Sequence, residues 1–211
     1  MTKKIVPIKN LSEVQKTLEV VAEKINKALF RGEITPYIIT IQTQGRRKNT
    51  VGWASIESYW MKKGSKGKVG YQELNICAEY LSDTEGVYET LVHELVHIWN
   101  AQNDIRDFSK SGVHNKKFKS KAEEVGLKVE KLDSKGWAYT SLEKNGVAEK
   151  LLKKLKLKKD IFTVSRMKMG SGKAKAEPKM KKWECGCTIV RCAVDLVPVC
   201  QECDNEFERA S

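Results

Sequence analysis

Two histidines and a glutamate occur together in the stretch His-Glu-Leu-Val-His at residues 93–97. On a helix, residues four apart lie one above the other, so His93 and His97 direct two imidazole nitrogens to one point, with Glu94 about 100° around the axis. Zinc accepts neutral imidazoles, keeps a position open and lowers the pKa of a bound water to about 7. The spacing therefore predicts metal-assisted hydrolysis, with Glu94 as the base that takes up the proton. The alternative is two core histidines bonded to backbone carbonyls, with a surface glutamate.

A third zinc ligand must come from elsewhere in the chain. A metzincin site would need Gly and His three and six residues after His97, and the chain has Asn100 and Asn103 there. The remaining histidine is His114, in "VHNKKF", where Phe118 lies one helical turn later and can fix the ligand against the core. His114 is therefore the favoured third ligand. The competing candidates are Asp104, Asp107, Glu123 and Glu124.

The elements around these residues predict an α+β fold of zincin-like type. A nearly all-apolar helix over about 85–102 belongs in a core and carries the two histidines. We expect an amphipathic helix at its amino-terminal side, a sheet of about three antiparallel strands and a helix that follows the third ligand. The expected ranges are 11–30 for the first helix, 37–43, 51–57 and 71–81 for the strands, 115–125 for the third-ligand helix and 127–142 for a hairpin.

Five of the six cysteines occur between residues 185 and 203. Cys185 and Cys187 lie two apart, and Cys200 and Cys203 form a C-x-x-C step, so four thiolates can close a tetrahedral zinc site. Cys192 either replaces Cys185 or Cys187 or is a small buried thiol, and the last is favoured. We therefore expect a second, structural Zn²⁺ in a small zinc ribbon over 183–211.

Positive charge is concentrated between the two sites. The net charge is +12, and residues 143–182 contain fourteen Lys or Arg against four acids. This segment combines a basic amphipathic helix, "VAEKLLKKLKL", with a Gly-, Ser- and Lys-containing linker over 165–182. Clustered cations bind a polyanion through counterion release, so DNA is the expected partner, held by this segment together with the zinc ribbon. The alternatives are a solvated lysine segment and a helix packed on the body with its lysines in water.

Several classes of protein are disfavoured by the sequence. No apolar run approaches the roughly 18 residues that span a bilayer, and the start, "MTKKIVPIKNLSEV", lacks the apolar core of a secretory signal. Crowded cysteines without such a signal favour metal over disulfides. We therefore expect a cytoplasmic monomer without membrane contact, associated with the nucleoid if the source is a bacterium or a phage.

The segments "ETLVHELVHIWN" and "GVHNKKFKSKAEEVGL" resemble the SprT-like (Spartan-type) metalloprotease family, in which HExxH is followed by His-Gly-x-x-Phe. The strands "VGWASIE" and "LNICAEYL" are also similar, so the resemblance covers about 11–126. Asn115 stands where the family usually has Gly. The resemblance implies that His93, His97 and His114 bind zinc and that Glu94 is the catalytic base. The cysteine pattern is similar to the carboxy-terminal zinc ribbon of bacterial SprT proteins.

The sequence thus predicts three parts: a SprT-like metalloprotease domain over 1–142, a basic helix and linker over 143–182, and the ribbon over 183–211. The resemblance implies protein substrates that are bound or crosslinked to DNA, while spacing alone implies only hydrolysis. The alternative is a non-proteolytic nucleic-acid or protein adaptor in which zinc is structural.

Overall fold

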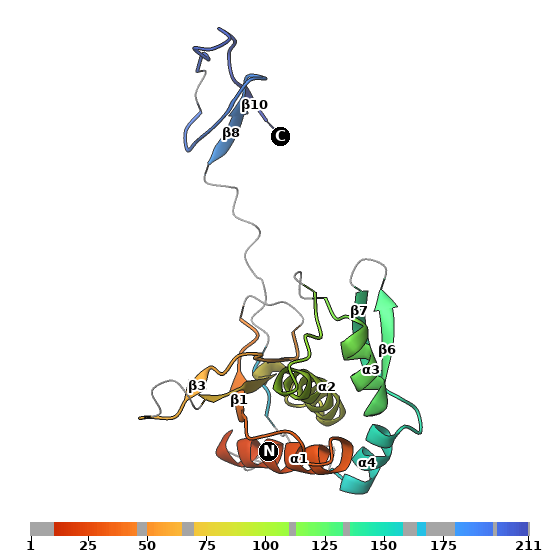
Figure 1. Cartoon of the computed structure of the whole chain (residues 1–211). Helices are drawn as coiled ribbons and strands as arrows, with labels where there is room; N and C mark the ends of the chain where they lie inside the picture. Colours follow the sequence, from red (N-terminus) through yellow and green to blue (C-terminus); the bar gives the residue numbers. More distant parts are fainter. Residues whose placement is uncertain are drawn as a thin grey trace, which may run out of the picture. The chain divides into compact units, whose positions relative to one another are not determined.

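The computed structural model describes residues 11–45, 50–64, 70–109, 113–132, 136–157, 164–167, 180–195 and 198–210. The chain divides into two compact units, Met1–Met167 and Lys168–Ser211 (Figure 1). The first unit contains the HExxH helix, and the second contains the clustered cysteines. The predicted α+β class is confirmed.

The central sheet has the three expected strands, but it is mixed rather than antiparallel. Its order is β1-β5-β2, with β5 (Glu73–Cys77) parallel to β1 (Ile38–Gln42) and antiparallel to β2 (Gly52–Ala54). Between β2 and β5 the chain forms a hairpin of β3 (Trp60–Met61) and β4 (Gly70–Tyr71), and β5 then returns between the first two strands. The antiparallel expectation is wrong because side-chain alternation identifies strands without specifying their neighbours.

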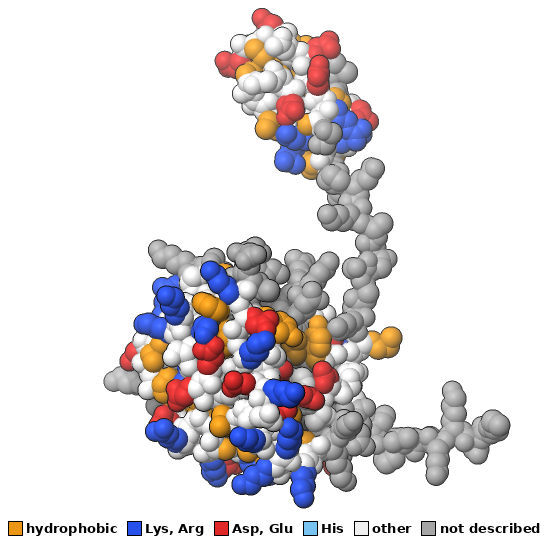
Figure 2. Space-filling model, turned by 90° about the vertical axis from the view of Figure 1, so that its right-hand side faces the viewer, with side chains coloured by type: hydrophobic (Ala, Val, Ile, Leu, Met, Phe, Trp, Pro, Cys, Tyr) orange, Lys and Arg blue, Asp and Glu red, His pale blue; other side chains and the backbone are white. Residues whose placement is uncertain are grey.

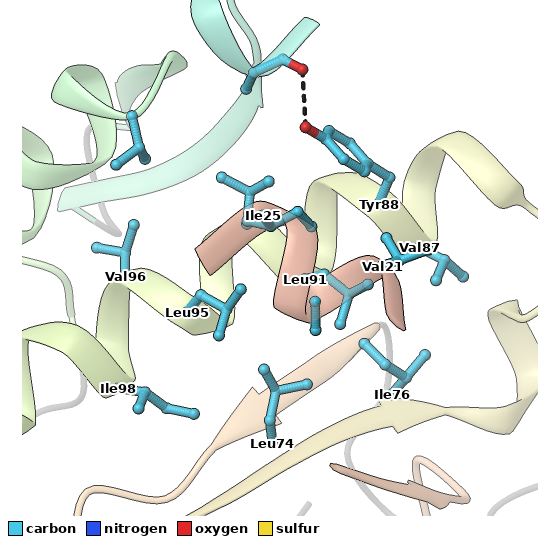
Figure 3. Packing of buried hydrophobic residues seen from close by; sticks show 14 of the residues in the cluster. Val21, Ile25, Leu74, Ile76, Val87, Tyr88, Leu91, Leu95, Val96 and Ile98 are labelled. Carbon is cyan, nitrogen blue, oxygen red and sulfur yellow. Dashed lines mark hydrogen bonds between the residues drawn. The ribbon is translucent and has the colours of Figure 1, made fainter. Parts of the chain in front are cut away.

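Helix α2 (Thr84–Gln102) lies in the core, as its apolar composition predicts. Asp83 caps it, accepting a hydrogen bond from the backbone N–H of Gly86 at 3.0 Å. Figure 3 shows its apolar side chains packed between β5 and α1 (Leu11–Leu29). The residues labelled there are Val21 and Ile25 of α1, Leu74 and Ile76 of β5, and Val87, Tyr88, Leu91, Leu95, Val96 and Ile98 of α2.

The elements after α2 complete the first unit. They are α3 (Lys116–Glu124), the hairpin of β6 (Leu127–Leu132) and β7 (Gly136–Leu142), and α4 (Val147–Leu155). The single turn η1 (Ala78–Tyr80) precedes α2. Helix α4 buries Ala148 and packs further leucines on the core, so the alternative of a helix packed on the body with lysines in water is the one observed. The sequence groups this helix with the linker in residues 143–182, whereas the structure places it in the first unit.

The second unit is a three-stranded antiparallel sheet in the order β10-β8-β9. Its strands are β8 (Lys181–Glu184), β9 (Ile189–Cys192) and β10 (Glu208–Arg209). Its core is formed by Trp183, Cys200 and Phe207. Most of the expected linker, residues 168–179, lies outside the described residues.

Among the described residues, no helix is both long and apolar enough to span a bilayer.

A buried hydrogen bond joins α2 to α4. The hydroxyl of Tyr88, which is fully buried, donates to the carbonyl oxygen of Ala148 at 2.8 Å (Figure 3). We expect Tyr88→Phe to lower the free energy of unfolding by about 1 kcal/mol, because the carbonyl loses this donor. Urea denaturation at saturating zinc measures the change. Tyr59→Phe is the control, since that ring is 64% exposed. Equal midpoints for both variants would show that the bond contributes nothing.

Candidate active site and metal centres

Three histidines converge at one point of the first unit. His93 and His97 lie on α2. His114 lies just before α3 and forms an isolated antiparallel β-bridge with Phe108. One nitrogen from each of the three lies within 4.8 Å of the others, and Nε2 of His97 is 3.0 Å from Nε2 of His114. The structure thus brings together the three histidines that the sequence singles out.

The other ring nitrogen of each histidine has its own partner. Two of these partners lie on β7, a strand that begins more than thirty residues after the end of α2. The Nδ1 contacts are His93 with Thr140 Oγ1 at 2.9 Å, His97 with Asp107 Oδ2 at 2.7 Å, and His114 with the carbonyl oxygen of Trp137 at 2.9 Å.

These contacts determine the chemistry that the site offers. A carboxylate and a carbonyl can only accept, so His97 and His114 carry their protons on Nδ1 and direct bare Nε2 lone pairs inward. In this tautomer the two Nε2 lone pairs lie 3.0 Å apart, and a cation between them, either a proton or a metal ion, removes their repulsion. Three imidazoles with outer hydrogen-bond partners are a ligand set that zinc prefers. The residues therefore fit the metal that the sequence predicts.

Asp107 contacts His97 and does not belong to the histidine group. Its side chain is buried, and the same oxygen that contacts His97 accepts a hydrogen bond from Asn100 Nδ2 at 3.0 Å. The other three competing candidates, Asp104, Glu123 and Glu124, do not belong to the histidine group.

Phe118 and Asn115 fix the position of His114. The buried Phe118 ring stacks on His114 with ring centroids 3.9 Å apart, and also contacts His93 and His97. Asn115 caps α3, because its side chain accepts from the N–H groups of Lys117 and Phe118 at 2.8 and 3.3 Å. Its φ is −106°, so the position does not require the glycine that is usual in the family.

Glu94 lies in the same cavity as the three imidazoles, which measures about 430 Å³. The residue is only 6% exposed, and its carboxylate accepts a hydrogen bond from the backbone of Ala54 in β2. Gly52 allows this approach, since a Cβ there would lie 2.5 Å from Cγ2 of Thr90 and 2.7 Å from the carbonyl oxygen of Asn75. The glycine thus lets β2 lie directly against the helix that carries Glu94.

Burial acts on the pKa values of Glu94 and of the three histidines. It raises the pKa of Glu94 to about 7, against the opposing effect of His97. It lowers the pKa values of His93 and His114, so these rings are neutral, the form that binds a metal. Burial also opposes the charged form of His97, but the hydrogen bond to Asp107 and the charge of Glu94 raise its pKa above the ordinary value.

The second candidate centre is formed by four thiols. Sγ of Cys187 lies 3.3 Å from Cys185, 3.4 Å from Cys200 and 3.3 Å from Cys203. These are the four cysteines predicted to bind a structural zinc. Cys192 does not belong to the group; it is half-buried, and its thiol donates to the carbonyl oxygen of Val194 at 3.0 Å.

Sequence reasoning did not identify the outer partners of the histidines on β7. Thr140 and the carbonyl of Trp137 belong to "GWAYTSL", which has no spacing relationship to 93–97. A strand that alternates Trp, Tyr and Ser with Ala, Thr and Leu indicates only a sheet. No local signal in the sequence marks these contacts.

An α+β unit with HExxH on a buried helix and a third histidine beside it is a zinc-metallopeptidase-like domain. The model of the SprT-like family matches residues 18–136, more than half of the chain, and the protein belongs to this family. The match ends before the four clustered cysteines, so the ribbon lies outside it. Comparison with curated proteins and with solved structures found no significant match.

Asp107→Asn should weaken metal binding at the histidine centre by about 10- to 100-fold, because His97 loses its charged partner. Competition between the full chain and a chelator for cobalt(II), followed by absorption, measures this. Only thiolate ligands add charge-transfer bands in the near ultraviolet, so the two centres are resolved. Asp104→Asn is the matched control, since Asp104 is exposed and has φ of 56°, which Asn tolerates. Equal affinities for both variants would contradict the assigned role of Asp107.

The cysteine centre can be tested by counting zinc. Cys187→Ser should reduce the metal content of the full chain from two zinc ions to one, since Cys187 contacts the other three thiols. Cys192→Ser should keep both ions. Mass spectrometry of the metal content provides the measurement, and loss of an ion in the Cys192 variant would make that thiol a ligand.

Proposed function

We propose that the protein is a zinc-dependent endopeptidase that cleaves proteins bound or crosslinked to DNA, with His93, His97 and His114 holding the catalytic zinc. The observation that carries this proposal is the presence of a buried carboxylate, Glu94, in one cavity with three converging imidazoles. Neither feature serves the packing of α2, and both are needed for hydrolysis.

Each residue of the site has a part in the reaction. The zinc ion supplies Lewis-acid activation of water and of the substrate carbonyl group. Glu94 takes a proton from the attacking water as the carbon–oxygen bond forms. It then delivers that proton to the amide nitrogen as the carbon–nitrogen bond breaks. Asp107 and Thr140 keep His97 and His93 oriented throughout.

A groove next to the metal site offers room for the polypeptide. A second hollow of about 600 Å³ shares Ala54, Ile56 and Phe108 with the metal-site cavity. Strand β2 lies at the edge of the described sheet, so its outer backbone groups are available to an extended substrate strand. The shared residues place the groove directly beside the catalytic cavity.

The charge distribution supports DNA as the partner and residues 143–182 as its main contact. Residues 143–182 contain fourteen Lys or Arg against four acids, whereas residues 183–211 contain six acids and two arginines. Figure 2 shows charges of both signs interspersed on the visible face of the first unit. The attraction to phosphates therefore arises mainly in residues 143–182, which include α4 of the first unit, and the ribbon adds little to it.

Glu94→Gln should lower the rate of protein cleavage by at least about 100-fold, because the amide cannot accept the proton. Cleavage of a DNA-binding protein by the full chain, with and without DNA, measures this, and DNA should stimulate the wild type. Glu85→Gln is the matched control, an exposed glutamate in the first turn of the same helix.

Two outcomes would contradict the proposal. Equal cleavage by wild type and Glu94→Gln would remove Glu94 from the mechanism. Absence of cleavage by the wild type, with zinc bound and DNA present, would favour the adaptor in which zinc is only structural.

A further inference from the structure

The hairpin of β3 and β4 carries an exposed aromatic surface outside the metal site. Tyr59 is 64% exposed, Trp60 45% and Met61 51%. Together with the exposed Lys63 we call these residues the hairpin surface. Figure 1 shows β3 projecting from the side of the central sheet. Adjacent exposed side chains of this size indicate a binding surface rather than an incompletely packed core.

The indole of Trp60 is held in a fixed orientation. Its Nε1 donates to Oε2 of Glu73 at 3.0 Å, and Glu73 is buried at the start of the central strand β5. The other oxygen of that carboxylate accepts from Oγ1 of Thr40 in β1 at 2.6 Å. The ring is therefore anchored to the sheet by its polar edge while nearly half of the residue remains exposed.

The backbone of the hairpin is closely packed as well. Trp60 pairs with Tyr71 across the two strands. A Cβ on Gly70 would lie 2.5 Å from Cβ of Ser58 and 2.9 Å from Sδ of Met61, so only glycine allows this approach. The aromatic residues are thus presented by a preformed element, which reduces the entropy lost when a ligand binds.

The chemistry of the hairpin surface favours a nucleic acid over a protein. The sequence "KKGSKGK" that joins β3 to β4 contains four lysines and no acid. Lysine is depleted at protein–protein interfaces, whereas aromatic rings beside cations are typical of proteins that bind single strands. Unpaired bases present free faces to an aromatic ring, and bases within a duplex are already stacked on each other.

We propose that the hairpin surface binds single-stranded DNA by stacking bases on Tyr59 and Trp60, with Lys63 contacting a phosphate. This inference rests on the proposed function, and it identifies a DNA contact on the catalytic unit itself. Tyr59 also lines the groove of about 600 Å³ that adjoins the metal-site cavity. A strand bound at the hairpin surface therefore brings protein attached to it close to the groove in which it is cleaved.

Binding of the full-length, zinc-loaded protein to a fluorescent oligothymidine and to a duplex of equal length, followed by anisotropy, tests the proposal. Tyr59→Leu should bind the single strand about tenfold more weakly, because it keeps an apolar side chain but loses the stacking face. Tyr59→Phe should bind as the wild type does. Duplex affinity should be the same for all three proteins.

Lys63→Gln tests the phosphate contact separately. It should weaken binding to the single strand and reduce the slope of log K against log salt concentration by about 0.7, the value expected for one phosphate contact. An unchanged slope would remove Lys63 from the surface. Equal unfolding midpoints of the variants and the wild type establish that the fold is intact.

The remaining outcomes separate this inference from the proposed function. If Tyr59→Leu and the wild type bind the single strand equally, or if the duplex is weakened as much, the stacking surface is overturned while DNA-stimulated cleavage stands. If Tyr59→Leu changes only the KM for protein, the surface binds polypeptide and the inference is wrong. If the wild type binds no DNA, both this inference and the DNA partner of the proposed function fall.

Discussion

The candidate active site depends on one constraint: three imidazoles and a carboxylate are taken out of water, and each needs a polar partner that also fixes its orientation. Helix α2 supplies none of the partners of its own histidines. Asp107 comes from the segment that follows the helix, and Thr140 comes from β7. The site therefore exists only when these segments are correctly packed, and the converging nitrogens are a property of the whole unit rather than of the HExxH helix.

The apolar surface around most of α2 allows the histidine nitrogens to converge. Packing on α1 and β5 fixes the rotation of the helix about its own axis, so the face with His93 and His97 meets the β6–β7 hairpin and α3. Phe118 then fills the space behind the three rings, and Gly52 lets β2 contact the opposite side beside Glu94. The bulk of Phe118 and the missing side chain of Gly52 together determine how closely the surrounding elements approach the cavity.

Much of the fold and of the candidate site could be predicted from the local spacing of apolar residues and from the small number of histidines. The helices and strands follow from apolar spacing, and His114 follows because the chain offers only one further histidine. The order of the sheet, the role of Asp107 and the contact with Thr140 could not be predicted in the same way. They are long-range pairings, which depend on how elements meet in space, and the spacing of residues within each element is the same for many such arrangements.

The two proposed metal centres differ in what the metal does for the fold. Among the described residues, the core of the first unit has twenty-four buried apolar residues, whereas that of the ribbon has three, one of which is the candidate ligand Cys200. So small a core offsets little of the conformational entropy of the chain, and bonds from the four thiolates to a metal ion would supply the stability that the ribbon lacks. The histidine centre is held by hydrogen bonds within a core that is complete without the ion. On the proposed assignments, zinc would stabilise structure in the second unit and supply chemistry in the first, and only the chemistry requires a carboxylate beside the ligands.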